Sequence, residues 1–154
     1  MTTQQFDLDA VRKMTTGAIP FAENAGVDLV EIERGLVVMK IPFEGNQNHV
    51  GIMYAGALFT LAEIPGGAIF MSAFDMTKYY PIVSDMSIKF LKPALTDVTC
   101  EATLSEEEIQ RVTTEAEENG KSKFELTTVL KDANGEIVAT TTGTYHARSH
   151  NYKK

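Results

Sequence analysis

The stretch from Ala55 to Phe74 constrains the fold of this chain more than any other part of the sequence. Its residues are almost all small or apolar, and Glu63 is its only charged residue. A helix that is apolar on every side must be enclosed by protein or by lipid. The length is sufficient for a bilayer span, but Glu63 and Pro65 lie near the middle, and no second apolar span or flanking basic cluster accompanies the stretch. We therefore expect a buried central helix and no membrane span.

Segments with alternating apolar residues lie on both sides of this helix, which is the pattern of half-buried strands. They cover residues 27–32, 36–41, 82–91, 98–104, 123–131 and 136–148. Asn134-Gly135 joins the last two, and this dipeptide indicates a tight hairpin turn. Residues 109–119 fit a short polar helix or a twisted extension of a strand, and the pattern does not choose between them.

This order of segments predicts an α+β fold, in which a curved antiparallel sheet of about five or six strands wraps around one long buried helix. The 154 residues suit a single domain, 1–154. Within it, residues 1–24 form an N-terminal helical segment, and the polar residues 149–154 form a loose tail. One sheet cannot cover every side of the helix. We therefore expect a second copy of the chain to cover the rest, in a homodimer or a dimer of dimers.

Charge and cysteine content exclude several functions. The net charge is −7 and the pI is near 4.9, which argues against a nucleic-acid footprint, since that needs clustered Lys and Arg. Cys100 is the single cysteine, and we expect it to be a small buried hydrophobe with no metal-ligand spacing around it. The N-terminus lacks the basic start and apolar run of a signal peptide, so a cytoplasmic location is the default expectation.

Two motifs resemble those of hotdog-fold thioesterases, most closely the phenylacetate-pathway and 4-hydroxybenzoyl-CoA branches. They are Asn48-His-Val-Gly-Ile-Met-Tyr54-Ala55-Gly56, followed by Leu61-Ala62-Glu63, and Ile88-Lys-Phe-Leu-Lys92-Pro93. The family's usual His-Gly is replaced here by Tyr54-Ala55. The resemblance implies a hotdog fold and an acyl-CoA thioesterase that needs no cofactor, coenzyme A being part of the substrate.

The resemblance also implies a catalytic set of Glu63, Asn48, Ala55 and Gly56. The backbone N–H groups of Ala55 and Gly56 would stabilise the oxyanion at a helix start. Glu63 would act as general base on water or as nucleophile. It follows Ala55 by eight residues, roughly 12 Å along a helix, so we expect two subunits to share each site. Asn48 either orients the attacking water or only forms a turn.

Three further residues are candidates for substrate binding. Tyr54 lines the acyl pocket or merely packs, while Lys89 and Lys92 meet the phosphates of coenzyme A or are simply solvated. The sequence does not set the length of the acyl chain. That length depends on how the large apolar side chains pack, and the candidates are Met53, Phe59, Phe70 and Met86. No metal site is expected.

Three alternatives remain open at this point. Glu63 could be a structural carboxylate, paired with a buried lysine or bonded to backbone that Pro65 frees. A non-catalytic acyl-CoA or lipid-binding protein would explain the missing His-Gly. A hotdog hydratase or dehydratase would use a loop His, here His49, with Glu63.

Overall fold

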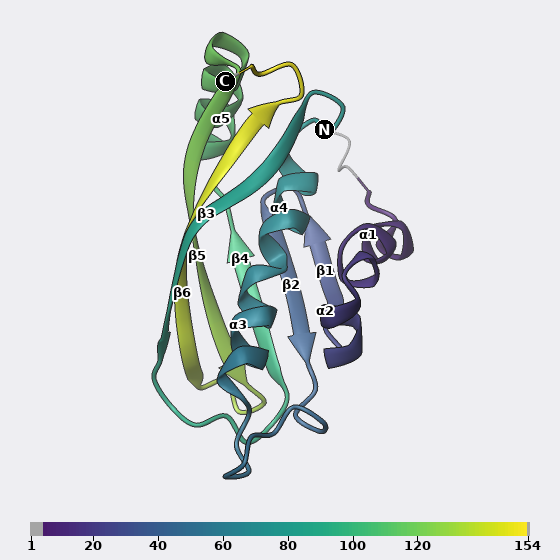
Figure 1. Ribbon diagram of the computed structural model, residues 1–154, viewed down its shortest axis with the longest axis vertical. Coiled ribbons are helices and arrows are strands. Elements are labelled where there is room, and N and C mark those ends of the chain that lie inside the picture. Colours follow the sequence, from purple (N-terminus) through teal and green to yellow (C-terminus); the bar gives the residue numbers. More distant parts are fainter. Residues whose placement is uncertain (1–4, 154) are drawn as a thin grey trace.

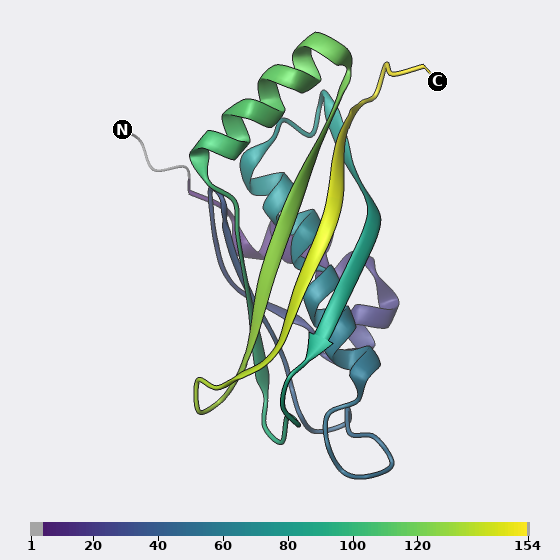
Figure 2. The same ribbon diagram turned by 90° about the vertical axis from the view of Figure 1, so that its left-hand side faces the viewer.

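The computed structural model describes residues 5–153, and its main element is one six-stranded antiparallel sheet in the order β1-β2-β4-β5-β6-β3. The strands are β1 (Asp28–Glu33), β2 (Leu36–Ile41), β3 (Tyr79–Phe90), β4 (Val98–Thr103), β5 (Lys121–Asp132) and β6 (Ile137–Ser149). The sheet curves around a central helix (Figures 1 and 2). The predicted hotdog architecture is confirmed.

The central helix consists of two segments, α3 (Ala55–Glu63) and α4 (Pro65–Ala73), although the sequence predicts a single helix. Ile64 keeps helical backbone angles between them, so the direction of the chain continues. The break arises because Pro65 has no N–H group and leaves the carbonyl of Leu61 without its helical partner. Glu63 is therefore the last residue of α3, beside a local interruption of the helical hydrogen bonds.

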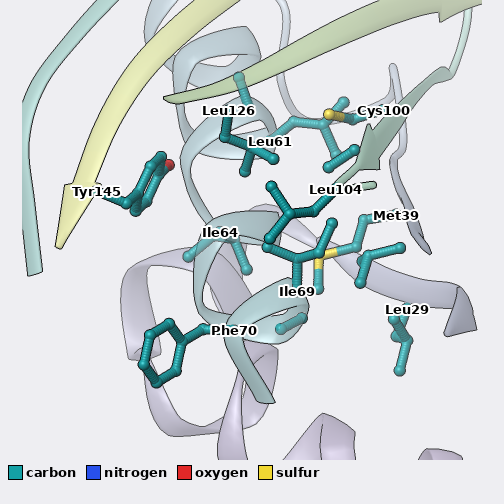
Figure 3. Packing of buried hydrophobic residues seen from close by; sticks show 14 of the residues in the cluster. Leu29, Met39, Leu61, Ile64, Ile69, Phe70, Cys100, Leu104, Leu126 and Tyr145 are labelled. Carbon is teal, nitrogen blue, oxygen red and sulfur yellow. The ribbon is translucent and has the colours of Figure 1, made fainter. Parts of the chain in front are cut away.

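The core fills the space between the helix and the concave face of the sheet (Figure 3). Alternate residues of β4, β5 and β6 point inward, as the two-residue period predicts. Cys100 is among these buried residues, as expected from the sequence, and burial raises its pKa to about 12. Phe70 and Met53 are both buried. Phe70 therefore contributes to the core.

Short helices cover two regions of the sheet. The N-terminal helical residues form α1 (Leu8–Met14), η1 (Thr16–Ala18) and α2 (Pro20–Ala25), and α1 packs against β1. Asp7 caps α1 by accepting hydrogen bonds from the first-turn amides. The ambiguous segment is a helix, α5 (Glu106–Asn119), which packs on β5. Its buried residues lie on the side facing the sheet and are Ile109, Val112 and Ala116.

Residues 149–153, part of the predicted loose tail, make several contacts with the strands. The backbone N–H of His150 donates to the carbonyl of Lys78, at 3.0 Å, and that of Tyr152 donates to Ser149, also at 3.0 Å. The Tyr152 ring lies 5.1 Å from the ammonium of Lys121. These contacts arise because the end of β6 runs beside the start of β5, where a ring and a cation can meet.

Candidate functional site

The start of α3 opens onto a cavity that we call the helix-start pocket, with a volume of about 300 Å³. The loop before α3 and the segment after β3 meet here, because the Met53 N–H donates to the Ala94 carbonyl at 2.9 Å. The lining residues are Asn48, Ile52, Met53, Ala55, Leu58, Phe90, Leu91, Lys92, Pro93 and Ala94. The pocket thus brings together three of the predicted site residues, Asn48, Ala55 and Lys92.

The helix start offers free backbone donors to this pocket. The carbonyl of Tyr54 accepts from the N–H groups of Ala57 and Leu58, at 3.0 and 3.2 Å. The N–H groups of Ala55 and Gly56 precede these and make no hydrogen bond within residues 5–153, as expected for the first turn of a helix. Two adjacent unpaired N–H groups at a helix N-terminus can stabilise a developing negative charge.

Asn48 holds the loop in shape. Its side-chain oxygen accepts hydrogen bonds from the backbone N–H groups of Val50, at 3.0 Å, and Ile52, at 3.2 Å. This is the turn-forming role that was one of its two predicted interpretations. The side-chain NH₂ group donates to no residue between 5 and 153, and the residue lines the helix-start pocket. The NH₂ group is therefore available to a ligand while the oxygen fixes the turn.

Tyr54 covers the helix start without lining the pocket. A β-carbon added at Gly56 would lie 2.5 Å from Cε1 of the Tyr54 ring, so the glycine is needed to let the ring fold back over the first turn. The ring is nevertheless largely exposed to solvent. The observed contact is the packing alternative considered for Tyr54, and it leaves the outer face of the ring free.

The two predicted phosphate-binding lysines lie in different settings. Lys92 lines the helix-start pocket and forms an ion pair with Glu136, with 3.2 Å between Nζ and Oε1. Lys89 is exposed on β3 and lines none of the pockets found among the described residues. The structure therefore brings Lys92, but not Lys89, to the helix start.

Glu63 faces a second cavity, which we call the Glu63 pocket, of about 170 Å³. Its carboxylate makes no hydrogen bond or ion pair within residues 5–153. Partial burial without a partner disfavours the charged form, so the pKa of Glu63 is raised above its ordinary value. The structural alternative for this residue required a buried lysine or a backbone partner, and the described residues supply neither.

The Glu63 pocket lies beneath the N-terminal helical segment. It is lined by Met14, Thr15, Ile19, Glu63, Ile64, Gly67, Met71, Met76 and Pro81. Apart from Glu63, the sequence singled out none of these residues. The methionines and Ile19 resemble ordinary core residues in an amphipathic pattern, and no local signal marks them as lining a cavity.

Tyr145 lies close to Glu63 from the side of the sheet. Figure 3 shows its ring projecting from β6, with the hydroxyl oxygen directed toward α3 and α4. The hydroxyl is buried and has no hydrogen-bond partner among the described residues. Burial, and secondarily the negative charge of Glu63, raises the pKa of Tyr145. No sequence signal marks this residue, because an inward-facing tyrosine on a strand looks like any other core aromatic.

Within one chain, Glu63 and the helix start serve different cavities. Glu63 is absent from the lining of the helix-start pocket, and Ala55 is absent from that of the Glu63 pocket. This agrees with their eight-residue separation along α3. A single chain therefore does not assemble the predicted catalytic set.

Within residues 5–153 there is no candidate metal site, and there is one helical stretch of membrane-spanning length. No group of three or more His, Cys, Asp or Glu side chains could hold a metal ion there. One helical stretch, 55–73, is apolar and long enough to cross a bilayer by length and composition alone, but 61% of it is buried inside the protein. The core helix of a protein that remains in water passes the same test.

The fold and site define a protein of the hotdog-fold thioesterase superfamily, as the sequence motifs predicted. A family model described as a domain of unknown function, DUF4442, matches residues 9–146. The chain belongs to this family. A comparison with curated proteins finds no match.

Solved structures agree with this assignment. A Pseudomonas aeruginosa protein of unknown function, with the designation "Probable Thioesterase", is 42% identical with a TM-score of 0.90, and the match covers 96% of this chain and 99% of that one. A Chlorobaculum tepidum protein of unknown function has 14% identity and a TM-score of 0.81, covering 91% and 93%. A Haemophilus influenzae thioesterase has 13% identity and a TM-score of 0.76, covering 97% and 98%. The last two similarities show the fold alone.

Proposed function

We propose that this protein is an acyl-CoA thioester hydrolase whose active site lies between two subunits of a homodimer. The observation that carries the proposal is the carboxylate of Glu63, which is half-buried beside an apolar cavity and has no charge or hydrogen-bond partner among residues 5–153. An ionisable group kept in such a setting is costly unless it has a function. The thioesterase designation of the 42% identical relative supports the same reaction.

The free edge of β3 supports the dimer. β3 ends the sheet, is twelve residues long and, among the described strands, pairs with β6 alone. Long unprotected edge strands readily pair with another chain. Apolar side chains on and just after this strand are exposed, among them Val83, Phe90 and Leu91. Two copies that pair antiparallel along β3 would bury these side chains and extend the sheet across both subunits.

This pairing would also complete the catalytic set. Phe90, at the end of β3, lines the helix-start pocket, while Pro81, near its beginning, lines the Glu63 pocket. A two-fold axis near the middle of β3 places the Phe90 end of one strand beside the Pro81 end of the other. The helix start of one subunit then faces Glu63 of the partner subunit, and each dimer contains two such sites.

Exposed apolar residues match this arrangement. One group belongs to the N-terminal helical segment beside the Glu63 pocket: Met14, Ile19 and Phe21. Another belongs to the loop before α3 and its first turns: Val50, Tyr54 and Phe59. In the proposed dimer the first group of one subunit approaches the second group of its partner. Both patches would then be covered.

The proposed reaction uses Glu63 of one subunit and the start of α3 of the other. Glu63 of one subunit removes a proton from water, and the water oxygen bonds to the thioester carbonyl carbon. The N–H groups of Ala55 and Gly56 from the other subunit stabilise the oxyanion, and the NH₂ group of Asn48 orients the reactants. The carbon–sulfur bond then breaks, and the thiolate of coenzyme A takes the proton back from Glu63. In the nucleophilic version, the Glu63 carboxylate attacks first and water hydrolyses the resulting anhydride.

The test is thiol release from a panel of acyl-CoAs by the wild type and by Glu63→Gln. We expect hydrolysis by the wild type and a loss of at least ~100-fold in kcat for the variant. Incubation in ¹⁸O-labelled water followed by mass spectrometry of the protein tests the nucleophilic role, because label enters Glu63 only when an anhydride forms and water attacks its Glu63 carbonyl carbon.

Controls separate the alternatives. His49 is exposed and does not line the Glu63 pocket, so His49→Ala should retain most of the activity. In a dehydratase, His49→Ala would abolish the enzymatic activity. Binding of acyl-CoA without thiol release, with equal affinity in Glu63→Gln, would instead identify a non-catalytic binding protein and contradict the proposal.

A further inference from the structure

We propose that the Glu63 pocket holds the acyl chain of the substrate and selects an unbranched aliphatic acyl group of medium length. The inference rests on the proposed hydrolase and names its substrate class. The thioester carbonyl must lie next to Glu63 for reaction, and the cavity that begins at Glu63 continues under the N-terminal helical segment. The acyl chain is the part of the substrate that this cavity can receive.

The lining favours a flexible hydrocarbon. Three of its nine residues are methionines, Met14, Met71 and Met76, and none is aromatic. Methionine side chains adapt to irregular apolar shapes, whereas aromatic ligands are commonly held by stacked rings. The wall therefore fits an alkyl chain better than a benzoyl or phenylacetyl group.

Polar acyl groups have no partner inside the pocket. Thr15 is the one hydroxyl in the lining, and its Oγ1 already donates to the carbonyl of Val11 at 2.7 Å. Glu63 is the one ionisable group, and its role is at the reacting carbon. An acyl chain carrying a hydroxyl or a second carboxylate would leave that group buried without a hydrogen bond, which is unfavourable.

The size of the cavity limits how much of the acyl chain it can enclose. The volume is about 170 Å³. A water molecule occupies about 30 Å³ in the liquid, and a methylene group is of similar size, so the cavity accommodates about six carbon atoms. Longer chains would have to displace the methionines or extend out of the pocket.

Gly67 provides a direct way to change that length. It lines the pocket, and a β-carbon added there meets no other atom within 4 Å. The first carbon of a larger side chain therefore has room at this position. Gly67→Leu should fill part of the pocket, while Met71→Ala should enlarge it. Thr114→Leu is the matched control, because Thr114 is exposed on α5 and lines no pocket among the described residues.

The experiment measures kcat/KM for thiol release from saturated acyl-CoAs of two to sixteen carbons and from benzoyl-CoA. For the wild type we expect a maximum near six carbons and a value for benzoyl-CoA at least ~10-fold lower. Gly67→Leu should lower kcat/KM for hexanoyl-CoA at least ~10-fold and move the maximum to shorter chains. Met71→Ala should move it to longer chains, and Thr114→Leu should leave the profile unchanged.

The two possible failures are distinguishable. Hydrolysis that depends on Glu63, but with a length profile unmoved by Gly67→Leu and Met71→Ala or a preference for benzoyl-CoA, overturns the pocket assignment alone. No thiol release from any acyl-CoA overturns the proposed function. The pocket is then tested by calorimetric titration with the hexyl thioether of coenzyme A. Binding weakened at least ~10-fold by Gly67→Leu supports the assignment, and equal or absent binding overturns it.

Discussion

The ring of Tyr145 lies directly against the backbone of Gly66. A β-carbon added at Gly66 would come within 2.6 Å of the Tyr145 hydroxyl oxygen, closer than real atoms approach. Both residues are buried, Gly66 in the first turn of α4 and Tyr145 on β6. This contact fixes the distance between the central helix and the sheet at the level of Glu63, three residues before Gly66.

Two adjacent glycines therefore respond oppositely to the same substitution. Gly66→Ala forces the Tyr145 ring to move and should lower the free energy of unfolding by about 1–3 kcal/mol. Gly67→Ala places its methyl group in open space and should raise that free energy by up to ~1 kcal/mol, through better helix propensity. Urea denaturation of both variants is the measurement. Equal effects on stability would contradict the packing described for Tyr145.

The buried hydroxyl of Tyr145 lowers the free energy of unfolding, and a substitution can remove it. It is buried without a hydrogen-bond partner among the described residues, and such a group typically costs ~1–3 kcal/mol. Tyr145→Phe keeps the ring against Gly66 and should raise the free energy of unfolding by about 1 kcal/mol. Tyr145→Leu, which also removes the ring, should destabilise the protein. A Tyr145→Phe variant less stable than the wild type would mean that the hydroxyl is bonded.

The raised pKa of Glu63 predicts where the pH–rate profile of the reaction falls on its acidic side. A general base or nucleophile must be deprotonated, so kcat/KM should fall as the pH drops through the pKa of Glu63. Because burial raises that pKa, the midpoint of the fall should lie above ~4.3, the ordinary value for glutamate. A pH–rate profile with its acidic midpoint at or below the ordinary value would contradict this assignment.

The same shift predicts how stability depends on pH. A carboxyl group with a higher pKa in the folded than in the unfolded chain binds its proton more tightly when folded. The Glu63 carboxyl therefore stabilises the folded chain fully at a pH below its pKa in the unfolded chain. This stabilisation is lost as the pH rises through the higher pKa of the folded chain. Glu63→Gln stays neutral, so it should be more stable than the wild type at neutral pH, and the two should converge near pH 4. A constant difference across this range would contradict the prediction.

Charge on the β3 edge should separate the subunits. Val83 is an exposed apolar residue of that strand, and Val83→Lys would place two like charges near each other in the proposed interface. We expect monomers by analytical ultracentrifugation and little remaining activity. Val30→Lys is the matched control on β1, the opposite edge of the sheet, where Val30 is also exposed. Loss of the dimer in Val30→Lys but not in Val83→Lys would place the interface on the β1 edge and contradict the proposed β3 interface.

The sequence predicts the elements of the fold well because each carries its own periodicity. The stretch that is apolar on every side indicated a central helix, with Glu63 and Pro65 favouring burial in protein over a membrane span, and Asn134-Gly135 marked the hairpin between β5 and β6. The break at Ile64 follows from the chemistry of Pro65, yet the sequence does not show whether the helix bends or continues there. The polar residues of α5 match helix and strand patterns equally until their contacts with β5 are known.

The site is less predictable because it depends on which distant side chains meet. The resemblance pointed to Glu63 and the helix start, and the structure gives both a cavity. It does not bring Lys89 to either. Met14 and Ile19 lie more than forty residues before Glu63, so only the packing of α1 and η1 over the central helix places them beside it.

Mixed dimers of two differently disabled chains test the shared site most directly. Glu63→Gln removes the carboxylate, and Ala55→Pro removes one oxyanion donor at a helix position that tolerates proline. If the site joins the helix start of one chain to Glu63 of the other, random mixing leaves one intact site in each mixed dimer. About a quarter of wild-type thiol-release activity should then return. Activity in the mixture no higher than the average of the two inactive parents would show that each chain works alone, and would contradict the account.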